Sequence, residues 1–362
     1  MNLIERVQTV IEYYNKWLIK YPTVESLAKS SLDDVNEIWA GLGYYRRAKY
    51  LHDGAKKLHS EHQNQFPNNA KDLQKLPGIG KYTAGAIASI VFHEPVPVVD
   101  GNVIRVLARL RMIDENPKTT KIQKLFWELA EKIVDPERPG CFNQALMELG
   151  ALICTNANPT CKSCPISSVC QAYQNSIQEK STVRVTDFPV KVKKQAPRQE
   201  SVVVCIVCAL ENKQSKFFLK NIKSAGKFLI IQRPTTGLLA SMWEFPSCAV
   251  ENNENETQRQ LLIKEYLKSN FGIKEEGIGK YQSISSPITH LFSHIRQTLL
   301  VDYCFVTESK EKNKKLTSKW VDWENLQSSA LSKGMKKALE AWESSLNSPS
   351  SISKFFKNKD NQ

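Results

Sequence analysis

Four cysteines lie close together in one short stretch of the chain. Cys154, Cys161, Cys164 and Cys170 follow the spacing C-x6-C-x2-C-x5-C and span seventeen residues. Such a loop can bring four thiolates to one centre, either tetrahedral zinc or an iron–sulfur cluster, and the spacing alone does not separate these two. The nine cysteines of the chain are an odd and unevenly placed set, which argues against a secreted disulfide scaffold. The stretch therefore predicts a local metal site.

Length and charge narrow the class of protein. A chain of 362 residues with 41% hydrophobic residues predicts two domains of ordinary size. No run of about 18 apolar residues occurs, and Glu5 and Arg6 stand where a signal peptide needs its apolar segment. We therefore expect a soluble, intracellular protein that binds no membrane. A net charge of +13 suits a polyanionic partner, although charge alone supports nucleic acid only weakly.

The first 175 residues show apolar residues at helical spacing, separated by short turns. Ser31 followed by Asp34 resembles a capping box, which opens a helix that Gly41 can end. This half is predicted to be all-α. Further helices are predicted over residues 46–62, 70–76, 82–92, 102–112, 119–134 and 141–154.

After Cys170 the composition changes, and a polar, proline-bearing stretch predicts a linker over residues 176–200. Apolar β-rich runs follow, with helical patterns over 257–271 and 335–342, so residues 201–346 predict an α+β domain. Residues 347–362 are expected to be a disordered tail. Cys205 and Cys208 stand three apart in a predicted strand, where they face opposite sides, so we expect core residues rather than metal ligands.

A glycine-rich turn joins two predicted helices in the segment LPGIGKYTAGAI, residues 76–87. Gly78 and Gly80 allow a tight turn with exposed amide groups, and amides at a helix N-terminus suit a phosphate oxygen. Lys81 adds positive charge. The segment predicts a sequence-independent DNA contact, with an ordinary interhelical turn as the alternative.

Asp100 precedes Gly101 at the predicted start of a helix. An aspartate in this position is commonly an N-cap. The same position directs a carboxylate out of the scaffold, where it can stabilise positive charge on a sugar. Both interpretations are open at this point.

Three segments in this order resemble the helix-hairpin-helix DNA glycosylases related to endonuclease III: LPGIGKYTAGAI, VVDGNVIRVLAR, and FNQALMELGALIC running into the four-cysteine loop. Within that superfamily, WAGLGYYRRA and Tyr82 resemble the MutY-type adenine DNA glycosylases, which remove adenine mispaired with 8-oxoguanine. The resemblance implies an all-α helix-hairpin-helix glycosylase domain with an iron–sulfur loop, here residues 1–175, which acts in base-excision repair.

The resemblance also implies roles for individual residues. Asp100 would stabilise the cationic sugar, with Asn102 and Tyr82 positioning substrate or intermediate. Bifunctional relatives carry a lysine where Tyr82 stands, so a glycosylase without strong lyase activity is implied. Tyr44 would wedge into the duplex beside 8-oxoguanine while adenine is extruded. The four cysteines would hold a 4Fe-4S cluster rather than zinc.

One expected group is missing from this alignment. The family's proton donor is a glutamate that would fall two positions before Met1, and Glu5 stands where the family has a threonine. We therefore expect a truncated glycosylase that binds DNA but excises adenine poorly. The alternative is a non-catalytic lesion-binding fragment or scaffold of the same family. A thymine or pyrimidine glycosylase is disfavoured, because those relatives usually lack the second domain.

The second half resembles the Nudix-like C-terminal domain of MutY proteins, through GLLASMWEFP and HLFSHIRQTL. The pattern of glutamates that loads metal in Nudix hydrolases is absent, so hydrolase activity is not expected. Phe292, Ser293 and His294 would form the loop that reads 8-oxoguanine, with an ordinary edge strand as the alternative.

The tail contains a segment similar to peptides that bind the sliding clamp PCNA. Ile352, Phe355 and Phe356 would enter the clamp's pocket, although Pro349 replaces the expected glutamine. This resemblance favours a nuclear protein, with the mitochondrion as a further location, and we expect a monomer. A tail without this function is the alternative.

Overall fold

The computed structural model describes most of the chain, and by its contacts the chain divides into two compact units. One unit comprises Thr23–Ala28 and Asp53–Gln195, and we call it the helical unit. The other comprises Met1–Pro22, Lys29–His52 and Ala196–Gln362, and we call it the sheet unit. The described residues are 7–192, 195–210, 222–251, 255–284, 286–292, 294–306 and 316–346.

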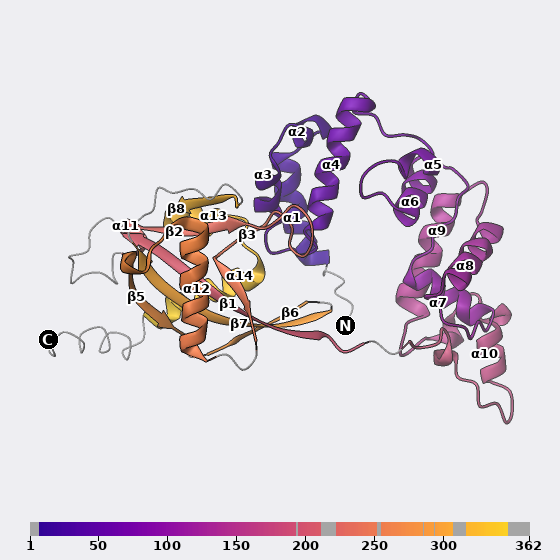
Figure 1. Ribbon diagram of the computed structural model, residues 1–362. Helices are drawn as coiled ribbons and strands as arrows, with labels where there is room; N and C mark the ends of the chain where they lie inside the picture. Colours follow the sequence, from indigo (N-terminus) through magenta and orange to yellow (C-terminus); the bar gives the residue numbers. More distant parts are fainter. Residues whose placement is uncertain are drawn as a thin grey trace. The chain divides into compact units, whose positions relative to one another are not determined.

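The helical unit consists of short helices joined by turns (Figure 1). The described part of the first half contains no strand, as the sequence predicts, and most helix bounds lie within one to three residues of expectation. The predicted helix over 141–154 is the exception, because it ends early and a π-helical turn, Leu149–Ile153, leads into Cys154. The helices are α2 (Val24–Ala28), the second half of α4 (Arg46–Glu61), α5 (Ala70–Leu73), α6 (Lys81–Val91), α7 (Gly101–Leu110), α8 (Thr120–Ile133), α9 (Pro139–Glu148) and α10 (Gln171–Ser176).

The core of the helical unit forms around α7 and α8. Val103, Leu107 and Phe126 are buried together, and the apolar residues of both helices recur at helical spacing, which is what an amphipathic helix needs to bury one face. Phe188 is buried in the same cluster. Part of the segment predicted as linker, residues 176–200, thus packs on the helical core, while the predicted domain boundaries themselves stay a prediction.

The sheet unit begins with three helices: α1 (Val7–Lys20), α3 (Leu32–Trp39) and the first half of α4. The predicted capping box is confirmed, because the Ser31 side chain accepts from the backbone N–H of Asp34 while the Asp34 carboxylate accepts from that of Ser31. Helix α3 ends two residues before Gly41, which has a φ of +102°. Among the described residues, no helix combines the length and apolar character needed to cross a bilayer.

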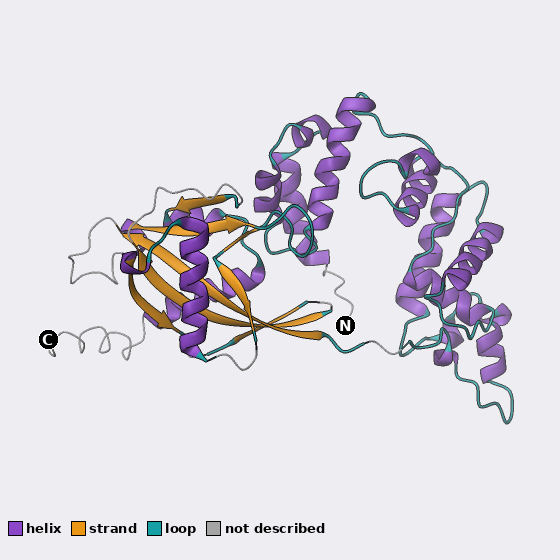
Figure 2. Ribbon diagram, viewed as in Figure 1, coloured by secondary structure: helices purple, strands orange, loops and turns teal. Residues whose placement is uncertain are grey.

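A mixed eight-stranded sheet forms the rest of this unit (Figure 2). Its central path runs β3-β2-β1-β7-β5, and β1 pairs with β7 in parallel while the other pairs are antiparallel. This agrees with the α+β expectation. The strands are β1 (Arg198–Leu210), β2 (Gly226–Gln232), β3 (Trp243–Glu244), β4 (Ser247–Val250), β5 (Ile278–Ser283), β6 (Ile288–Leu291), β7 (Ile295–Val306) and β8 (Ser318–Val321).

Helices cover both faces of the sheet, so β1 is apolar on both sides. Helix α12 (Glu256–Phe271) packs on one face and α14 (Lys333–Leu346) on the other, while α13 (Trp323–Ser328) also joins the α14 side. Cys205 is buried on the α12 face and Cys208 on the α14 face. The prediction that these two cysteines are core residues on opposite sides is confirmed.

Candidate active site

The glycine turn opens the N-terminus of helix α6. Gly78 has a φ of +79°, which favours glycine, and Gly80 is the N-cap of α6 without a side-chain cap. A Cβ atom on Gly80 would meet nothing within 4 Å, so the turn is open at this point. Lys81 follows, and its ammonium lies 4.0 Å from the centre of the Trp127 ring. The turn thus places an open N-cap beside a positive charge.

Asp100 is the N-cap of helix α7. Its Oδ1 accepts from the backbone N–H groups of Asn102, at 2.9 Å, and Val103, at 2.8 Å. Its Oδ2 accepts from the Asn102 side-chain amide at 2.9 Å. The capping interpretation is therefore what the structure shows, and the remaining acceptor capacity of the half-buried carboxylate leaves a catalytic role compatible with it.

Tyr82 lies in the first turn of α6, 42% exposed, with its hydroxyl 3.6 Å from the sulfur of Met147. Burial, and then the negative charge of Asp100, raise the pKa of Tyr82. The two predicted site residues therefore lie close enough to interact electrostatically, and the phenol is held in its neutral form at physiological pH.

Two arginines of α7 connect the Asp100 end of the helix with the cysteine loop. Arg105 donates to the Asn102 side-chain oxygen at 2.9 Å, to the carbonyl of Cys154 at 2.7 Å, and to the carbonyl of Gly150. A Cβ on Gly150 would lie 2.7 Å from the Cβ of Asn102, so the π-helical turn approaches α7 as closely as glycine allows. Asp100 and Cys154 are thereby joined by a continuous chain of hydrogen bonds.

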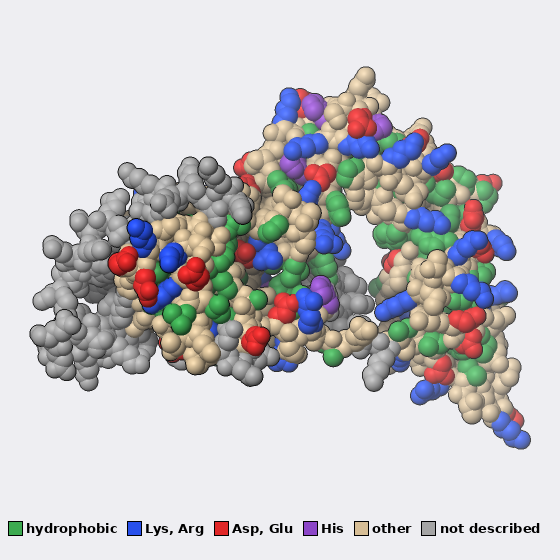
Figure 3. Space-filling view, in the orientation of Figure 1, with side chains coloured by type: hydrophobic (Ala, Val, Ile, Leu, Met, Phe, Trp, Pro, Cys, Tyr) green, Lys and Arg blue, Asp and Glu red, His purple; other side chains and the backbone are tan. Residues whose placement is uncertain are grey.

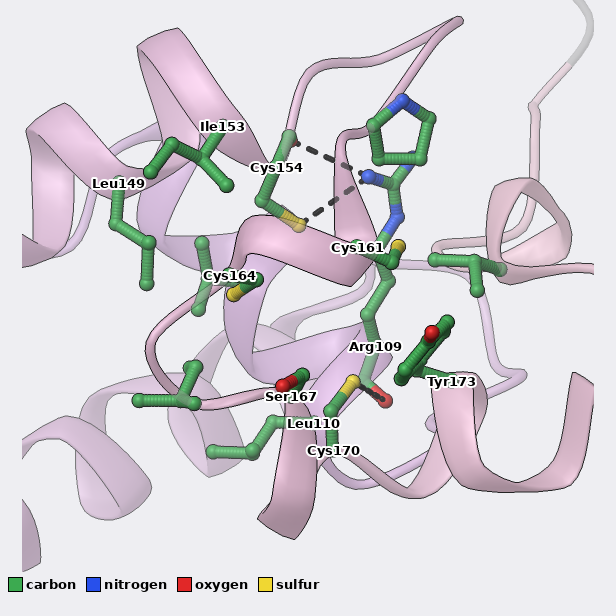
Figure 4. Close-up of a pocket in the computed structure, with 14 residues that line it drawn as sticks. Arg109, Leu110, Leu149, Ile153, Cys154, Cys161, Cys164, Ser167, Cys170 and Tyr173 are labelled. Carbon is green, nitrogen blue, oxygen red and sulfur yellow. Dashed lines mark hydrogen bonds between the residues drawn. The ribbon is translucent and has the colours of Figure 1, made fainter. Parts of the chain in front are cut away.

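Arg109 is 1% exposed and forms hydrogen bonds with the cysteine loop. Its guanidinium donates to the Cys154 sulfur at 3.2 Å and to carbonyl oxygens of the same loop (Figure 4). It also donates to the carbonyl of Phe188 at 3.0 Å. Neither arginine was predicted as a site residue from the sequence. Their signal was two cations, four residues apart, within the otherwise apolar helix GNVIRVLARL.

The four predicted cysteines line one hollow with Arg109, Leu149 and Tyr173 (Figure 4). Burial and then the neighbouring Cys154 and Cys170 thiols raise the pKa of Cys161. Among the described residues, no three Cys, His, Asp or Glu side chains lie close enough to ligate one metal ion. The structure thus brings the four thiols around a shared space without converging them on a single point.

Tyr44 and the Phe292 loop belong to the sheet unit. Tyr44 is 48% exposed, with a φ of +48°, and the Arg47 guanidinium lies 4.8 Å from its ring centre. Phe292 is half-buried and its ring meets that of His290 edge-on at 4.5 Å. His294 is exposed. Ser293 lies outside the described residues.

Substitutions at Asp100 separate its capping from its charge. Asp100→Ala is expected to lower the free energy of unfolding by about 1 kcal/mol, because two backbone N–H groups lose their acceptor. Asp100→Asn should change it by less than about 0.5 kcal/mol, since asparagine caps helices as well as aspartate does. Urea unfolding of both variants measures this, and an equal loss in both would show that the charge rather than the cap stabilises α7.

Comparisons with known proteins agree with the two halves of the fold. Residues 5–132 match the HhH-GPD superfamily of base excision DNA repair proteins, and residues 219–341 match the NUDIX domain. A thermostable thymine-DNA glycosylase of known structure is 30% identical, with a TM-score of 0.42, and the match covers 46% of this chain and 76% of that one.

Curated relatives match across both halves. The chain is 46% identical over 325 residues to an adenine DNA glycosylase of Arabidopsis thaliana, covering 83% of this chain but only 50% of that protein. It is 36% identical over 372 residues to the adenine DNA glycosylase of Mus musculus, covering 93% of this chain and 69% of that protein. The chain thus spans half the length of the plant relative. On these matches and the fold, it belongs to the adenine DNA glycosylase family.

Proposed function

We propose that this protein removes adenine from DNA by hydrolysing its N-glycosidic bond. The observation that carries the proposal is the Asp100 carboxylate, fixed at the start of α7 within the electrostatic reach of Tyr82. Family membership supports the same reaction. A target base must leave the stack before such a site can reach its sugar, so the substrate is a duplex with an extruded nucleotide.

The carboxylate would act on the sugar. Loss of adenine leaves positive charge on the deoxyribose, and an anion held in place before the reaction stabilises that charge without reorganising. Three hydrogen bonds fix Asp100 in orientation, one of them from the Asn102 side chain. Asn102 is itself held by Arg105. We therefore assign Asp100 the stabilising role and Asn102 a positioning role.

Tyr82 supports a glycosylase that does not cut the strand. A Schiff base with the sugar needs an amine, which a phenol does not supply. A tyrosine hydroxyl is protonated at physiological pH, and burial and Asp100 raise the pKa of Tyr82 further, so it is also a poor nucleophile. Tyr82 would contact the substrate or intermediate through a neutral hydroxyl.

The reaction also needs a proton donor to adenine. Glu5 lies outside the described residues. A non-catalytic lesion binder stays the alternative function. Single-turnover assays distinguish the two, because a binder retains the duplex without releasing adenine.

The Asp100 proposal is tested with the variant that keeps the helix cap. Asp100→Asn should reduce single-turnover excision from an 8-oxoguanine:adenine duplex by about 100-fold to 1,000-fold, the cost of losing one preorganised electrostatic group. Duplex affinity should stay within about threefold, because phosphate contacts dominate affinity. Excision by Asp100→Asn at the rate of the unsubstituted chain would refute the assignment.

DNA contact is proposed at the glycine turn. Gly78 turns the chain into the open N-cap at Gly80, and this N-cap with Lys81 beside it suits a phosphate oxygen and carries no base information. Lys and Arg side chains also lie at many places on the face drawn in Figure 3, in keeping with the net charge of +13.

We propose that the cysteine loop holds a 4Fe-4S cluster, with Cys154, Cys161, Cys164 and Cys170 as ligands. The donor set fits: four soft thiols surround one hollow, and Arg109 offsets the negative charge at Cys154. Four thiols also suit a single zinc ion, and membership of the HhH-GPD superfamily favours the cluster. Bound metal would fix the shape of this loop.

Metal analysis tests the cofactor. Protein purified without oxygen is expected to contain iron and acid-labile sulfide in equal amounts, and Cys164→Ala should lower both because one ligand is lost. Cys141→Ala is the matched control, since Cys141 is exposed and outside the loop. Stoichiometric zinc without sulfide would contradict the proposal.

Recognition of 8-oxoguanine is proposed for two places in the sheet unit. Tyr44 presents an exposed ring that could enter the duplex. Phe292 and His294 lie between β6 and β7, where an aromatic ring could pack on the strand and polar groups could meet the base edge. Ser293 stays part of this proposal on the sequence resemblance.

The recognition loop is tested by Phe292→Ala. We expect the preference for 8-oxoguanine:adenine over guanine:adenine duplexes to fall about tenfold, because one desolvated aromatic contact is worth about 1–2 kcal/mol. Equilibrium binding to both duplexes measures the ratio. Leu291→Ala is the control, because this neighbouring side chain is exposed and lacks a ring; an unchanged ratio in Phe292→Ala refutes the role.

Clamp binding and a nuclear location stay predictions. Ile352, Phe355 and Phe356 lie outside the described residues, so the tail's contribution rests on its sequence resemblance alone. The monomeric state likewise stays a prediction.

A further inference from the structure

Tyr44 and Tyr45 are neighbours in sequence but differ in burial. Tyr44 is 48% exposed, whereas Tyr45 is 8% exposed and belongs to the apolar cluster of the sheet's α14 face. Trp39, at the end of α3, packs on the same cluster. The proposed duplex wedge is therefore attached, through the next residue, to the core of the Nudix-like fold.

The turn that carries Tyr44 is held by its own hydrogen bonds. The Trp39 indole N–H donates to the carbonyl of Gly43 at 2.7 Å, and the backbone N–H of Gly41 donates to the Tyr45 hydroxyl oxygen at 3.1 Å. Gly41, Gly43 and Tyr44 all have positive φ values. For Tyr44 this conformation is unfavourable, and it persists only where the surroundings impose it.

The sheet contributes a matching element. The loop after β2 has positive φ values at Leu239 and Ser241, and Leu239 packs on the same cluster as Tyr45. Arg233 braces this loop by donating to the Leu238 carbonyl at 2.9 Å and to the buried Glu244 carboxylate at 2.6 Å. Hydrogen bonds therefore fix both the Tyr44 turn and the loop after β2, which meet at the cluster.

A polar contact runs alongside the apolar one. The side-chain amide of Gln232, at the end of β2, donates to the Asp33 carboxylate of α3 at 3.0 Å. The amide also donates to the Ser241 carbonyl at 3.2 Å. Helix α3 and the loop after β2 thus share one hydrogen-bonding group.

The same cluster reaches the proposed recognition loop. Leu299 of β7 is one of its buried members, and Ile288 of β6 packs against it. These two residues are paired across the strands that end at the Phe292 turn. One close-packed core therefore carries both elements proposed to meet 8-oxoguanine, and such cores transmit displacement rather than absorb it.

We infer that Tyr45 is a positioning residue for lesion recognition: it locks the Tyr44 turn to the core that also carries the Phe292 loop. This inference rests on the proposed function and adds to it. The Nudix-like domain would then act on recognition twice, once through its own loop and once by holding an aromatic ring that belongs to the helical sequence region.

A double-mutant cycle in the full chain tests the coupling. The unsubstituted chain, Tyr44→Ala, Tyr45→Ala and the double variant are compared for equilibrium binding to 8-oxoguanine:adenine and guanine:adenine duplexes whose adenine nucleoside resists hydrolysis. Tyr45→Ala should lower the preference for 8-oxoguanine about tenfold, and the double variant should fall no further than Tyr44→Ala alone, because both act through one ring.

Two further variants separate positioning from folding. Tyr45→Phe keeps the buried ring and removes the oxygen that accepts from Gly41, so it should fold normally and lose part of the preference. Tyr50→Ala, which removes an exposed tyrosine of the following helix α4, should leave the ratio unchanged.

Three results would overturn the inference. In the first, Tyr45→Ala and Tyr45→Phe weaken binding to both duplexes equally, which is what a merely structural role predicts. In the second, the effects of Tyr44→Ala and Tyr45→Ala on the ratio add. In the third, the unsubstituted chain shows no preference, and the proposed function then fails first and takes this inference with it.

Discussion

The guanidinium of Arg109 is the interaction on which the helical unit depends. It belongs to α7, is buried, and donates to the cysteine loop and to the carbonyl of Phe188, so it joins three segments of the chain. A buried guanidinium without acceptors would cost several kcal/mol. Here, four backbone carbonyl groups accept from it, so the loop and the helix hold each other in place.

Helix α7 carries both Arg109 and, at its N-terminus, the proposed catalytic residue Asp100. Its apolar face packs on α8, its arginines face the cysteine loop, and its N-terminus ends in Asp100. The Asp100 carboxylate caps the helix and accepts a hydrogen bond from the Asn102 side chain. Its negative charge also raises the pKa of Tyr82, after burial. Structural and chemical demands thus coincide in one side chain, which explains why the capping interpretation and the catalytic one were both reasonable from the sequence.

Much of the fold followed from local patterns. Periodicity gave the helices of the first half, the Ser31–Asp34 pair gave a capping box, and alternation along β1 placed Cys205 and Cys208 on opposite faces. Contacts between distant segments of the chain could not be predicted from these local patterns. Nothing local distinguishes Tyr45 from Tyr44, or marks Phe188 as core, because burial of either depends on partners far away in the chain. The two arginines of α7 were missed for the same reason: their acceptors are backbone carbonyls, which no sequence displays.

The close contact between the cysteine loop and α7 depends on the glycine at position 150. Gly150 touches Asn102 so closely that even an alanine methyl group would force two backbones apart. The two segments forced apart would be the π-helical turn that precedes Cys154 and the first turn of α7, which Asp100 caps. A larger residue at position 150 would therefore disturb the cysteine loop and the Asp100 end of α7 together, although it replaces a residue of neither set of candidate ligands or acids.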